Sequence, residues 1–398
     1  MYRIHPALQH YDWGSTTAIP DALGLVPDGR PVAEAWFGAH VSAPATVELA
    51  DGPCGLDELV AGDPSAVLGA DVATRFGKQL PYLLKLIAAH RPVSLQVHPS
   101  TASAQRGFAA EDARGVPCDA PHRSYRDRNH KPELVYALTR FDAMVGFRAP
   151  RRAAELLRGL DVPLAESLRA LLVADPGSSG VRTAFAWLLS PATRPDAEQI
   201  DRLVEACARR LEDGSPSPRT DRTVIRLAQT NPGDVGAVTS VLLNPVTLRP
   251  GEALFVPAGS VHTYLSGFGV EIMANSDNVL RAGLTSKHVD VAGLLENVDT
   301  VAAPPIRIAP ERGFSATETF YAPVDDFELS ITRLSDEGDT RIPGRGPRIV
   351  LCLEGDVTVR TQHDGDVRLV RGQSAFVPAA DGVVTARGDG VLAQADVP

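Results

Sequence analysis

Three polar side chains share one face of a predicted strand in the segment 93–99. Ser94, Gln96 and His98 alternate with a leucine and a valine, and side chains alternate between the two faces of a strand. Burying three polar groups without partners costs a few kcal/mol for each, and a metal or a polar ligand would supply those partners. The segment is therefore a candidate binding site. A solvated strand face with a lone histidine explains this segment, taken alone, equally well.

Two further segments each carry one residue that can bind a metal. Glu133 opens an apolar run of five residues, so its carboxylate lies either at a solvated strand end or against a ligand. His262 ends the pattern Gly251-x5-Pro257-x-Gly259-x2-His262, in which the glycines permit tight turns. This pattern is similar to the second motif of the cupin barrels, which implies a histidine that faces the barrel lumen.

Together, these segments supply two imidazoles, one carboxylate and one amide oxygen as candidate metal ligands. Neutral imidazoles with a carboxylate suit zinc, iron or manganese. The four cysteines lie far apart and form no CxxC pair, which argues against a thiolate zinc site and against a disulfide framework. Water or substrate could complete the coordination of a catalytic ion beside these ligands. Two cations, Arg281 and Lys287, follow shortly after the histidine strand.

Short apolar runs bounded by glycine, proline, aspartate or asparagine predict the strands that must hold these residues. The predicted strands span 33–39, 83–88, 93–97, 132–138, 238–243, 253–256 and 270–273, and short helical turns are predicted at 57–60 and 65–68. The strand signal therefore occupies two parts of the chain, up to about residue 150 and again from about residue 236.

The intervening part of the chain shows the period of helices. Leu164, Leu168 and Leu172 fall on one helical face, and a second apolar stripe begins at Ile200, shortly after a typical helix start at Asp196. We interpret both stripes as helix core. The helical block is thus an insertion between two β segments of one domain.

An internal repeat links the second β segment to the last part of the chain. Residues 248–259 (LRPGEALFVPAG) align with residues 369–380 (LVRGQSAFVPAA). In each copy a glycine turn precedes an apolar strand that ends in proline, which suits a double-sheet jelly roll. Only the first copy continues to a histidine, so we expect the second barrel to be structural.

We therefore expect a mainly β fold with cupin-type jelly-roll barrels and an inserted α-helical domain. The predicted domains are a discontinuous catalytic jelly roll of residues 1–150 plus 236–320, a helical insert of residues 151–235, and a smaller C-terminal jelly roll of residues 321–398.

Composition narrows the possible partners. The 398 residues are 44% hydrophobic and 22% charged, with a net charge of −10. An acidic chain without a basic run is not expected to bind nucleic acid or an anionic membrane, although a few local cations suffice for a phosphorylated small molecule. No apolar segment approaches the ~18 residues of a membrane span, and the N-terminus lacks a signal-peptide core. We expect a cytoplasmic protein and a monomer.

Five segments resemble, in order, the motifs of the type I phosphomannose isomerase family. They are YDWGS at 11–15, EAWFGAH at 34–40, QVHP at 96–99, HKPE at 130–133 and SDNVLRAGLTSK at 276–287. They extend over about residues 1–290, and the helical insert and the trailing barrel also fit the family layout. Each motif is weak alone, but five in the family's order are highly specific.

The resemblance implies a metal centre and a reaction. It implies one Zn²⁺ per subunit, and the ligands would be Gln96, His98, Glu133 and His262. The reaction would be the interconversion of mannose 6-phosphate and fructose 6-phosphate, with a small sugar phosphate as the binding partner. The family motifs also contain His40 and His130, which we interpret as supporting residues rather than ligands.

The resemblance also implies roles around the metal. It places Arg281 at the catalytic centre, with Ser94 and Lys287 toward the substrate phosphate. Further family positions that line the same cavity are Lys131, Tyr264, Glu271 and Asp277.

Aldose–ketose isomerisation needs groups of these kinds. A proton moves between C1 and C2 through an enediol or enediolate, and a metal ion and a fixed guanidinium such as that of Arg281 stabilise the developing charge. The sequence does not identify the base. Candidates are Glu271, Asp277 and Lys131, and Tyr264 could relay protons between the sugar oxygens.

One position departs from the family pattern. Members commonly read His-Pro-Asp-Lys after the metal histidine, whereas residues 98–101 read His-Pro-Ser-Thr. A contact of that lysine at the cavity rim is therefore in doubt. The arginines between Arg106 and Arg128 are candidates to replace it.

Two other functions fit part of the pattern. A cupin oxygenase would hold Fe(II) on His98, His262 and Glu133, although Gln96 on the same face would leave less room for O2 and substrate. A non-catalytic sugar-phosphate-binding cupin would keep the barrel without turnover. The presence of Arg281 together with all four ligand types weighs against this second alternative.

Overall fold

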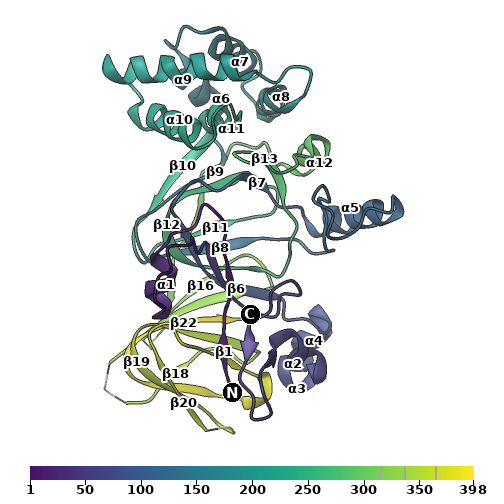
Figure 1. The fold of residues 1–398 in the computed structure, drawn as a ribbon, viewed down its shortest axis with the longest axis vertical. Helices are drawn as coiled ribbons and strands as arrows, with labels where there is room; N and C mark the ends of the chain where they lie inside the picture. Colours follow the sequence, from purple (N-terminus) through teal and green to yellow (C-terminus); the bar gives the residue numbers. More distant parts are fainter. Residues whose placement is uncertain (314–315, 336–337, 364) are drawn as a thin grey trace.

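The computed structural model describes residues 1–313, 316–335, 338–363 and 365–398. Figure 1 shows three parts along the long axis: a helical region at one end, a β barrel in the middle, and a second β barrel at the other end. The mainly β fold with inserted helices is thus confirmed, while the domain bounds stay a prediction. None of the helices in the described ranges has the length and apolar character needed to cross a membrane.

The middle barrel is an antiparallel sheet that carries the predicted site. Its main order is β14-β11-β8-β12-β6-β3-β2, and β7, β9, β10 and β13 are attached through β12 and one another. The strands are β2 (Ala7–Gln9), β3 (Glu34–Phe37), β6 (Tyr82–Ala89), β7 (Leu95–Val97), β8 (Glu133–Ala137), β9 (Phe141–Phe147), β10 (Leu243–Leu248), β11 (Ala253–Val256), β12 (His262–Ala274), β13 (Leu280–Gly283) and β14 (Ile306–Ile308). Most predicted strands are therefore confirmed, with shifted ends.

Strand β12 joins the two halves of this barrel. Its first part pairs with β9 and β7, and its second part, from Gly267 onward, pairs with β6 and β8. The strand changes partners at Gly267, whose φ is 137°. A Cβ atom there would lie 2.7 Å from the Cα atom of Phe141, so only glycine fits this crossing. The bend brings residues from both halves of the barrel around one lumen.

The helical region is inserted between β9 and β10. Its helices are α6 (Pro150–Leu157), α7 (Pro163–Ala174), α8 (Ser178–Leu189), α9 (Ala197–Glu212) and α10 (Pro218–Thr230). The predicted start of α9 is confirmed, because the Asp196 carboxylate accepts a hydrogen bond from the backbone N–H of Gln199 at 2.8 Å. Leu168 and Leu203, one in each apolar stripe, are fully buried, as expected for helix core.

The predicted strand at 238–243 is wrong. The chain there forms α11 (Gly236–Thr239) and a 3-10 turn, η1 (Ser240–Leu242), and β10 begins only at Leu243. Asp234 Oδ1 accepts a hydrogen bond from the N–H of Gly236 at 2.7 Å and starts the helical turn. Because this apolar run is buried on all sides, it has no periodicity that would separate helix from strand.

The second barrel is formed by strands from both ends of the chain. Its order is β15-β16-β17-β22-β19-β21-β1-β4-β5, with β18 on β22 and β20 on β19. The strands are β1 (Tyr2–His5), β4 (Thr46–Val47), β5 (Cys54–Gly55), β15 (Glu311–Arg312), β16 (Thr317–Tyr321), β17 (Glu328–Leu334), β18 (Thr340–Ile342), β19 (Arg348–Thr361), β20 (Asp366–Val370), β21 (Ser374–Val377) and β22 (Val384–Asp396).

The remaining helices cover the barrels. They are α1 (Ala18–Leu23), α2 (Leu56–Gly62), α3 (Pro64–Leu68), α4 (Ala70–Phe76), α5 (Thr101–Ala113), α12 (Val291–Asn297) and the 3-10 turn η2 (Ala379–Asp381). Helices α2 and α3 confirm the helical turns predicted in this part of the chain.

The internal repeat corresponds to one strand in each barrel. Its copies form β11 and β21, and the preceding turns place Gly251 and Gly372 at φ 90° and 85°. The two sheets also share an apolar core that includes Leu84 and Ile272 from the middle barrel and Phe320 from the second. This shared core holds the barrels against each other.

Candidate metal centre and substrate cavity

Three predicted metal ligands converge inside the middle barrel. The ligating atoms of His98, Glu133 and His262 all lie within 4.8 Å of one another, and all three residues are buried. His98 Nε2 lies 3.1 Å from Glu133 Oε1, and His262 Nε2 lies 3.2 Å from Glu133 Oε2. The carboxylate therefore sits between two imidazole rings from distant parts of the chain.

Strand register explains why these residues meet. Glu133 opens β8 opposite Met273 of β12, and His262 opens β12 opposite Gln96 of β7. Gln96 is in turn paired with Arg281 of β13. Residues opposite each other on neighbouring strands share a face, so Arg281, Gln96 and His262 form one row across three strands.

Backbone carbonyls orient both histidine rings. His98 Nδ1 lies 2.7 Å from the carbonyl oxygen of Asn278, and His262 Nδ1 lies 3.0 Å from that of Ser260. A carbonyl can only accept, so each Nδ1 donates its proton and each Nε2 keeps a free lone pair. Both lone pairs are therefore available at the centre beside Glu133.

Gln96 completes the predicted ligand set. Its Nε2 atom lies 3.2 Å from His262 Nε2. A half turn of the amide exchanges its nitrogen and oxygen, and the oxygen is then the atom next to His262. This is the orientation in which the side chain can bind a cation.

The protonation states suit a divalent cation. Burial lowers the pKa of His98 to about 4, against the opposing effect of Glu133. Burial raises the pKa of Glu133, but His98 and Lys131 lower it more, so that it lies well below its ordinary value. A neutral imidazole and an ionised carboxylate are the forms that bind metals.

One orphaned atom supports the same conclusion. His98 Nε2 is buried and has no hydrogen-bond partner among the described residues, because it carries no proton and the nearby Glu133 oxygen can only accept. A buried polar atom without a partner is costly. The residues present therefore fit a bound metal ion.

The centre opens into a cavity of about 630 Å³, within the usual range for small-molecule sites. The structure brings every other predicted site residue to this cavity. Those that line it are Ser94, Gln96, Lys131, Glu133, Tyr264, Glu271, Asp277, Arg281 and Lys287. All of these residues therefore surround the same cavity, while their individual roles stay a prediction.

Buried charged side chains lie in the cavity wall near the candidate metal centre. Lys85, on β6, lies 3.7 Å from Glu34 Oε1 and 3.4 Å from Glu271 Oε2. Burial lowers the pKa of Lys85, but the two carboxylates outweigh burial and raise it above its ordinary value. Burial, reinforced by Glu133, raises the pKa of Glu271 to about 7. Lys85 is thus a fixed positive charge beside a carboxyl that titrates near neutrality.

Sequence reasoning missed Lys85. It stands alone in the apolar run that forms β6, where all eight residues are buried. A lysine inside such a run is almost never buried without a charged partner, and that was the available signal. Glu34 and Trp36 also line the cavity, and Trp36 Nε1 donates to Glu34 Oε2 at 2.7 Å.

Asp277 is held by a histidine from the EAWFGAH motif. His40 Nε2 lies 3.3 Å from Asp277 Oδ1. Burial raises the pKa of Asp277, but the contact with His40 and the charges of Lys131 and Lys85 lower it overall to about 2. His40 therefore supports Asp277 in the ionised state and does not reach the metal centre.

Comparisons with known proteins agree with this geometry. Residues 1–150 match the family model described as phosphomannose isomerase type I, catalytic domain. The chain is 38% identical to the mannose-6-phosphate isomerase of Escherichia coli (strain K12) over 397 residues, which cover 99% of each chain. The chain belongs to the type I phosphomannose isomerase family.

This chain is also similar to a plant relative and to solved structures. Mannose-6-phosphate isomerase 1 of Arabidopsis thaliana is 31% identical over 95% of this chain and 89% of its own length. A crystal structure of the Salmonella typhimurium enzyme, described as bound to fructose 6-phosphate and zinc, is 36% identical. It covers 99% of this chain and 98% of its own, with a TM-score of 0.89.

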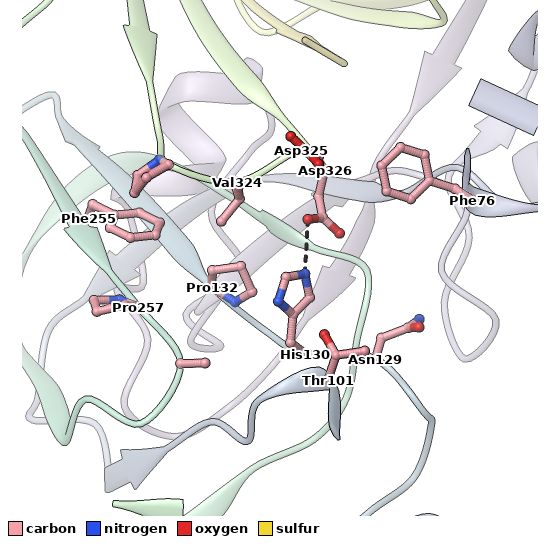
Figure 2. A pocket seen from close by; sticks show the side chains of 12 residues that line it. Phe76, Thr101, Asn129, His130, Pro132, Phe255, Pro257, Val324, Asp325 and Asp326 are labelled. Atoms are coloured by element: carbon pink, nitrogen blue, oxygen red, sulfur yellow. Dashed lines mark hydrogen bonds and ion pairs between the residues drawn. The ribbon is translucent and has the colours of Figure 1, made fainter. Parts of the chain in front are cut away.

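The departure from the family motif after His98 lies outside the substrate cavity. Thr101, which stands where members commonly have lysine, lines a different cavity between the two barrels. Figure 2 shows this second cavity, in which the imidazole of His130 points toward Asp326, with Nε2 2.9 Å from Oδ2. His130 thus joins the barrels rather than binding metal, and the missing lysine removes no cation from the substrate cavity.

Glu133→Gln is expected to lower the affinity for zinc by more than about 100-fold. The change keeps the shape but removes the only ligand charge, and even residues that merely orient a ligand contribute 10–100-fold. Zinc content after dialysis and competition with a chelating dye would measure this. Glu155→Gln, on the exposed side of α6, is the matched control. Retention of one tightly held zinc by Glu133→Gln would contradict the assigned centre.

Proposed function

We propose that this chain interconverts mannose 6-phosphate and fructose 6-phosphate through an enediol or enediolate, with one Zn²⁺ per subunit. The observation that carries the proposal is the convergence of Gln96, His98, Glu133 and His262 beside Arg281 at one sugar-sized cavity. Full-length relatives that bear the name mannose-6-phosphate isomerase support it. They favour the isomerase over an Fe(II) oxygenase and over a non-catalytic binding protein.

A zinc ion bound at this centre would supply Lewis-acid stabilisation of the charge that develops on the sugar oxygens. Gln96, His98, Glu133 and His262 would hold it. The protein contributes a dry centre for that purpose, because Glu133 and both histidines are buried and their rings are fixed by backbone carbonyls.

Arg281 supplies a second stabilising charge. It lies opposite Gln96 on the neighbouring strand, lines the cavity, and makes no side-chain hydrogen bond or ion pair with any described residue. Burial and the neighbouring Arg126 lower its pKa from an ordinary value of 12.5, but a guanidinium stays charged at neutral pH. Such a fixed cation can stabilise the enediolate without moving a proton.

The candidate bases differ in how far their side chains are exposed to the cavity. The side chain of Asp277 is 32% exposed, whereas that of Glu271 is 2% exposed and packs on Lys85. A base must reach a carbon-bound proton of the substrate, which favours Asp277 over Glu271 and over Lys131, which is buried beside Glu133. Its low pKa makes Asp277 a weak base, and stabilisation of the enediolate by Arg281 compensates by making the substrate proton more acidic.

We assign to Tyr264 the transfer of protons to and from the sugar hydroxyl oxygens. Its hydroxyl oxygen lies 3.5 Å from Glu133 Oε2. Burial raises the pKa of Tyr264 well above its ordinary value, so the hydroxyl keeps its proton at neutral pH. It can then donate to a sugar oxygen near the metal while Asp277 carries the carbon-bound proton.

Two further expectations stay proposals. We retain the cytoplasm as the compartment, and the four cysteines, all free in the structure, fit a reducing compartment. We also retain a monomer as the expected oligomeric state.

A coupled assay on mannose 6-phosphate tests the proposed function directly. The purified protein is expected to form fructose 6-phosphate, to lose activity after chelation, and to regain it when zinc is added. Absence of turnover with full zinc occupancy would overturn the isomerase assignment. Turnover by a metal-free preparation would overturn the metal-dependent part alone.

Arg281→Ala is expected to fold and bind zinc but to lose activity by about 10²–10³-fold, as when one donor to a developing oxyanion is removed. The loss should appear in kcat, and zinc content and the melting temperature should match those of the parent protein. Turnover near the parent rate would show that Arg281 is not a catalytic residue.

Asp277→Asn and Glu271→Gln distinguish the two carboxyl candidates. In D2O, the parent enzyme should exchange the C2 proton of mannose 6-phosphate with solvent. Asp277→Asn should abolish this exchange because an amide cannot accept the proton, and Glu271→Gln should retain it. The reverse pattern would make Glu271 the base.

A further inference from the structure

Four cations that line the substrate cavity have no ion-pair partner among the described residues: Arg91, Arg126, Arg281 and Lys287. The last three act on one another. Arg281 comes from β13, Lys287 from the segment that follows it, and Arg126 from the loop between α5 and β8. In the part of the chain that the structure describes, none of these side chains makes a hydrogen bond or an ion pair. Lys287 has one recorded contact, with its Nζ 5.7 Å from the centre of the Tyr11 ring.

The three charges act on one another. Burial lowers the pKa of Lys287, and the charges of Arg281 and Arg126 lower it further. Arg126 acts on Arg281 in the same way. The charge of Asp12 opposes this effect on Lys287 but is the smallest of these influences. Like charges gathered in a partly buried space are unfavourable, and a bound dianion would relieve that repulsion. At the metal centre, by contrast, Lys85 and Lys131 have carboxylate partners.

Arg126 differs from the neighbouring arginines of its segment in its side-chain contacts. Arg123 also lines the cavity, but its guanidinium is buried and donates to Tyr125 O at 2.7 Å and to Asp112 Oδ1 at 2.8 Å. The guanidinium of Arg128 lies 4.9 Å from the centre of the Phe108 ring and does not line the cavity. Only Arg126 combines a place on the cavity wall with a side chain that no described residue engages.

The backbone of Arg126 is nevertheless fixed relative to the metal centre. Its N–H donates to Asn278 Oδ1 at 2.7 Å, and Asn278 Nδ2 donates to the carbonyl oxygen of Asn129 at 2.8 Å. The carbonyl of the same Asn278, a fully buried residue, accepts the bond that orients His98. One residue therefore sets the spacing between the base of the Arg126 side chain and a metal ligand.

We infer that Arg126 is a phosphate-binding residue of this isomerase and that, with Lys287, it selects substrates carrying a phosphate dianion. The inference rests on the proposed function and deepens it. A guanidinium can bind two phosphate oxygens at once, and the exposed side chain of Arg126 is free to close on them. The fixed position of Arg126 then sets the distance between the phosphate and the metal, and a six-carbon sugar must be able to span that distance.

Arg126→Ala tests this inference. The KM for mannose 6-phosphate should rise about tenfold or more, as expected for the loss of one charged hydrogen bond, while kcat changes much less. The inhibition constant of inorganic phosphate, used as a competitive probe, should rise in parallel. Zinc content should not change. Arg126→Lys should recover part of the phosphate affinity because it restores the charge but not the fork.

Arg128→Ala is the matched control, because it removes the same side chain two positions along the loop. It should leave KM and the phosphate inhibition constant unchanged. Unchanged values for Arg126→Ala, or equal rises in both variants, would overturn the role of Arg126. Absence of turnover by the parent protein would instead overturn the proposed function, so the two failures are distinguishable.

Discussion

The buried negative charge of Glu133 is the constraint on which the rest of the structure depends. The residue is 2% exposed, and its carboxylate oxygens lie 3.1 and 3.2 Å from two imidazole nitrogens that carry no proton at those positions. Lys131, 3.5 Å away, compensates only part of this charge. Such an arrangement is costly unless a cation occupies the space between the side chains. The bend of β12 and the short strand β7 bring these side chains together.

The candidate ligands that converge in the structure, His98, Glu133 and His262, could be selected from the sequence because each is a residue of ligating type at a marked place in an apolar strand. The sequence could not predict Lys85 in the same way, since a single lysine in β6 acquires meaning only when Glu34 and Glu271 arrive from other strands. The segment 238–243 was predicted as a strand and is helical, because an apolar run buried on all sides carries no period. Asp234, which starts that helix with a side-chain bond, lies outside the apolar run that suggested the strand.

Asn278 illustrates what a motif cannot reveal by itself. The segment SDNVLRAGLTSK identifies the family, but its asparagine acts mainly through backbone groups of other loops. It accepts from Arg126 and Asp127, donates to Asn129, and accepts from His98 through its own carbonyl. Bonds of this kind depend on loop conformation rather than on residue type, so they become readable only in three dimensions. Their effect is to connect the loop that carries Arg126 to the candidate metal centre.

Strand β1 lies between β21 and β4 in the second barrel, with Tyr2 opposite Phe376. Its partner β4 follows closely in the sequence, but its partner β21 (Ser374–Val377) is remote, so this second pairing cannot form until that part of the chain has been made. Contacts between such remote positions slow folding and leave a sheet edge open to wrong pairing in the meantime. The second barrel can therefore close only late in folding, when β1 and β21 pair.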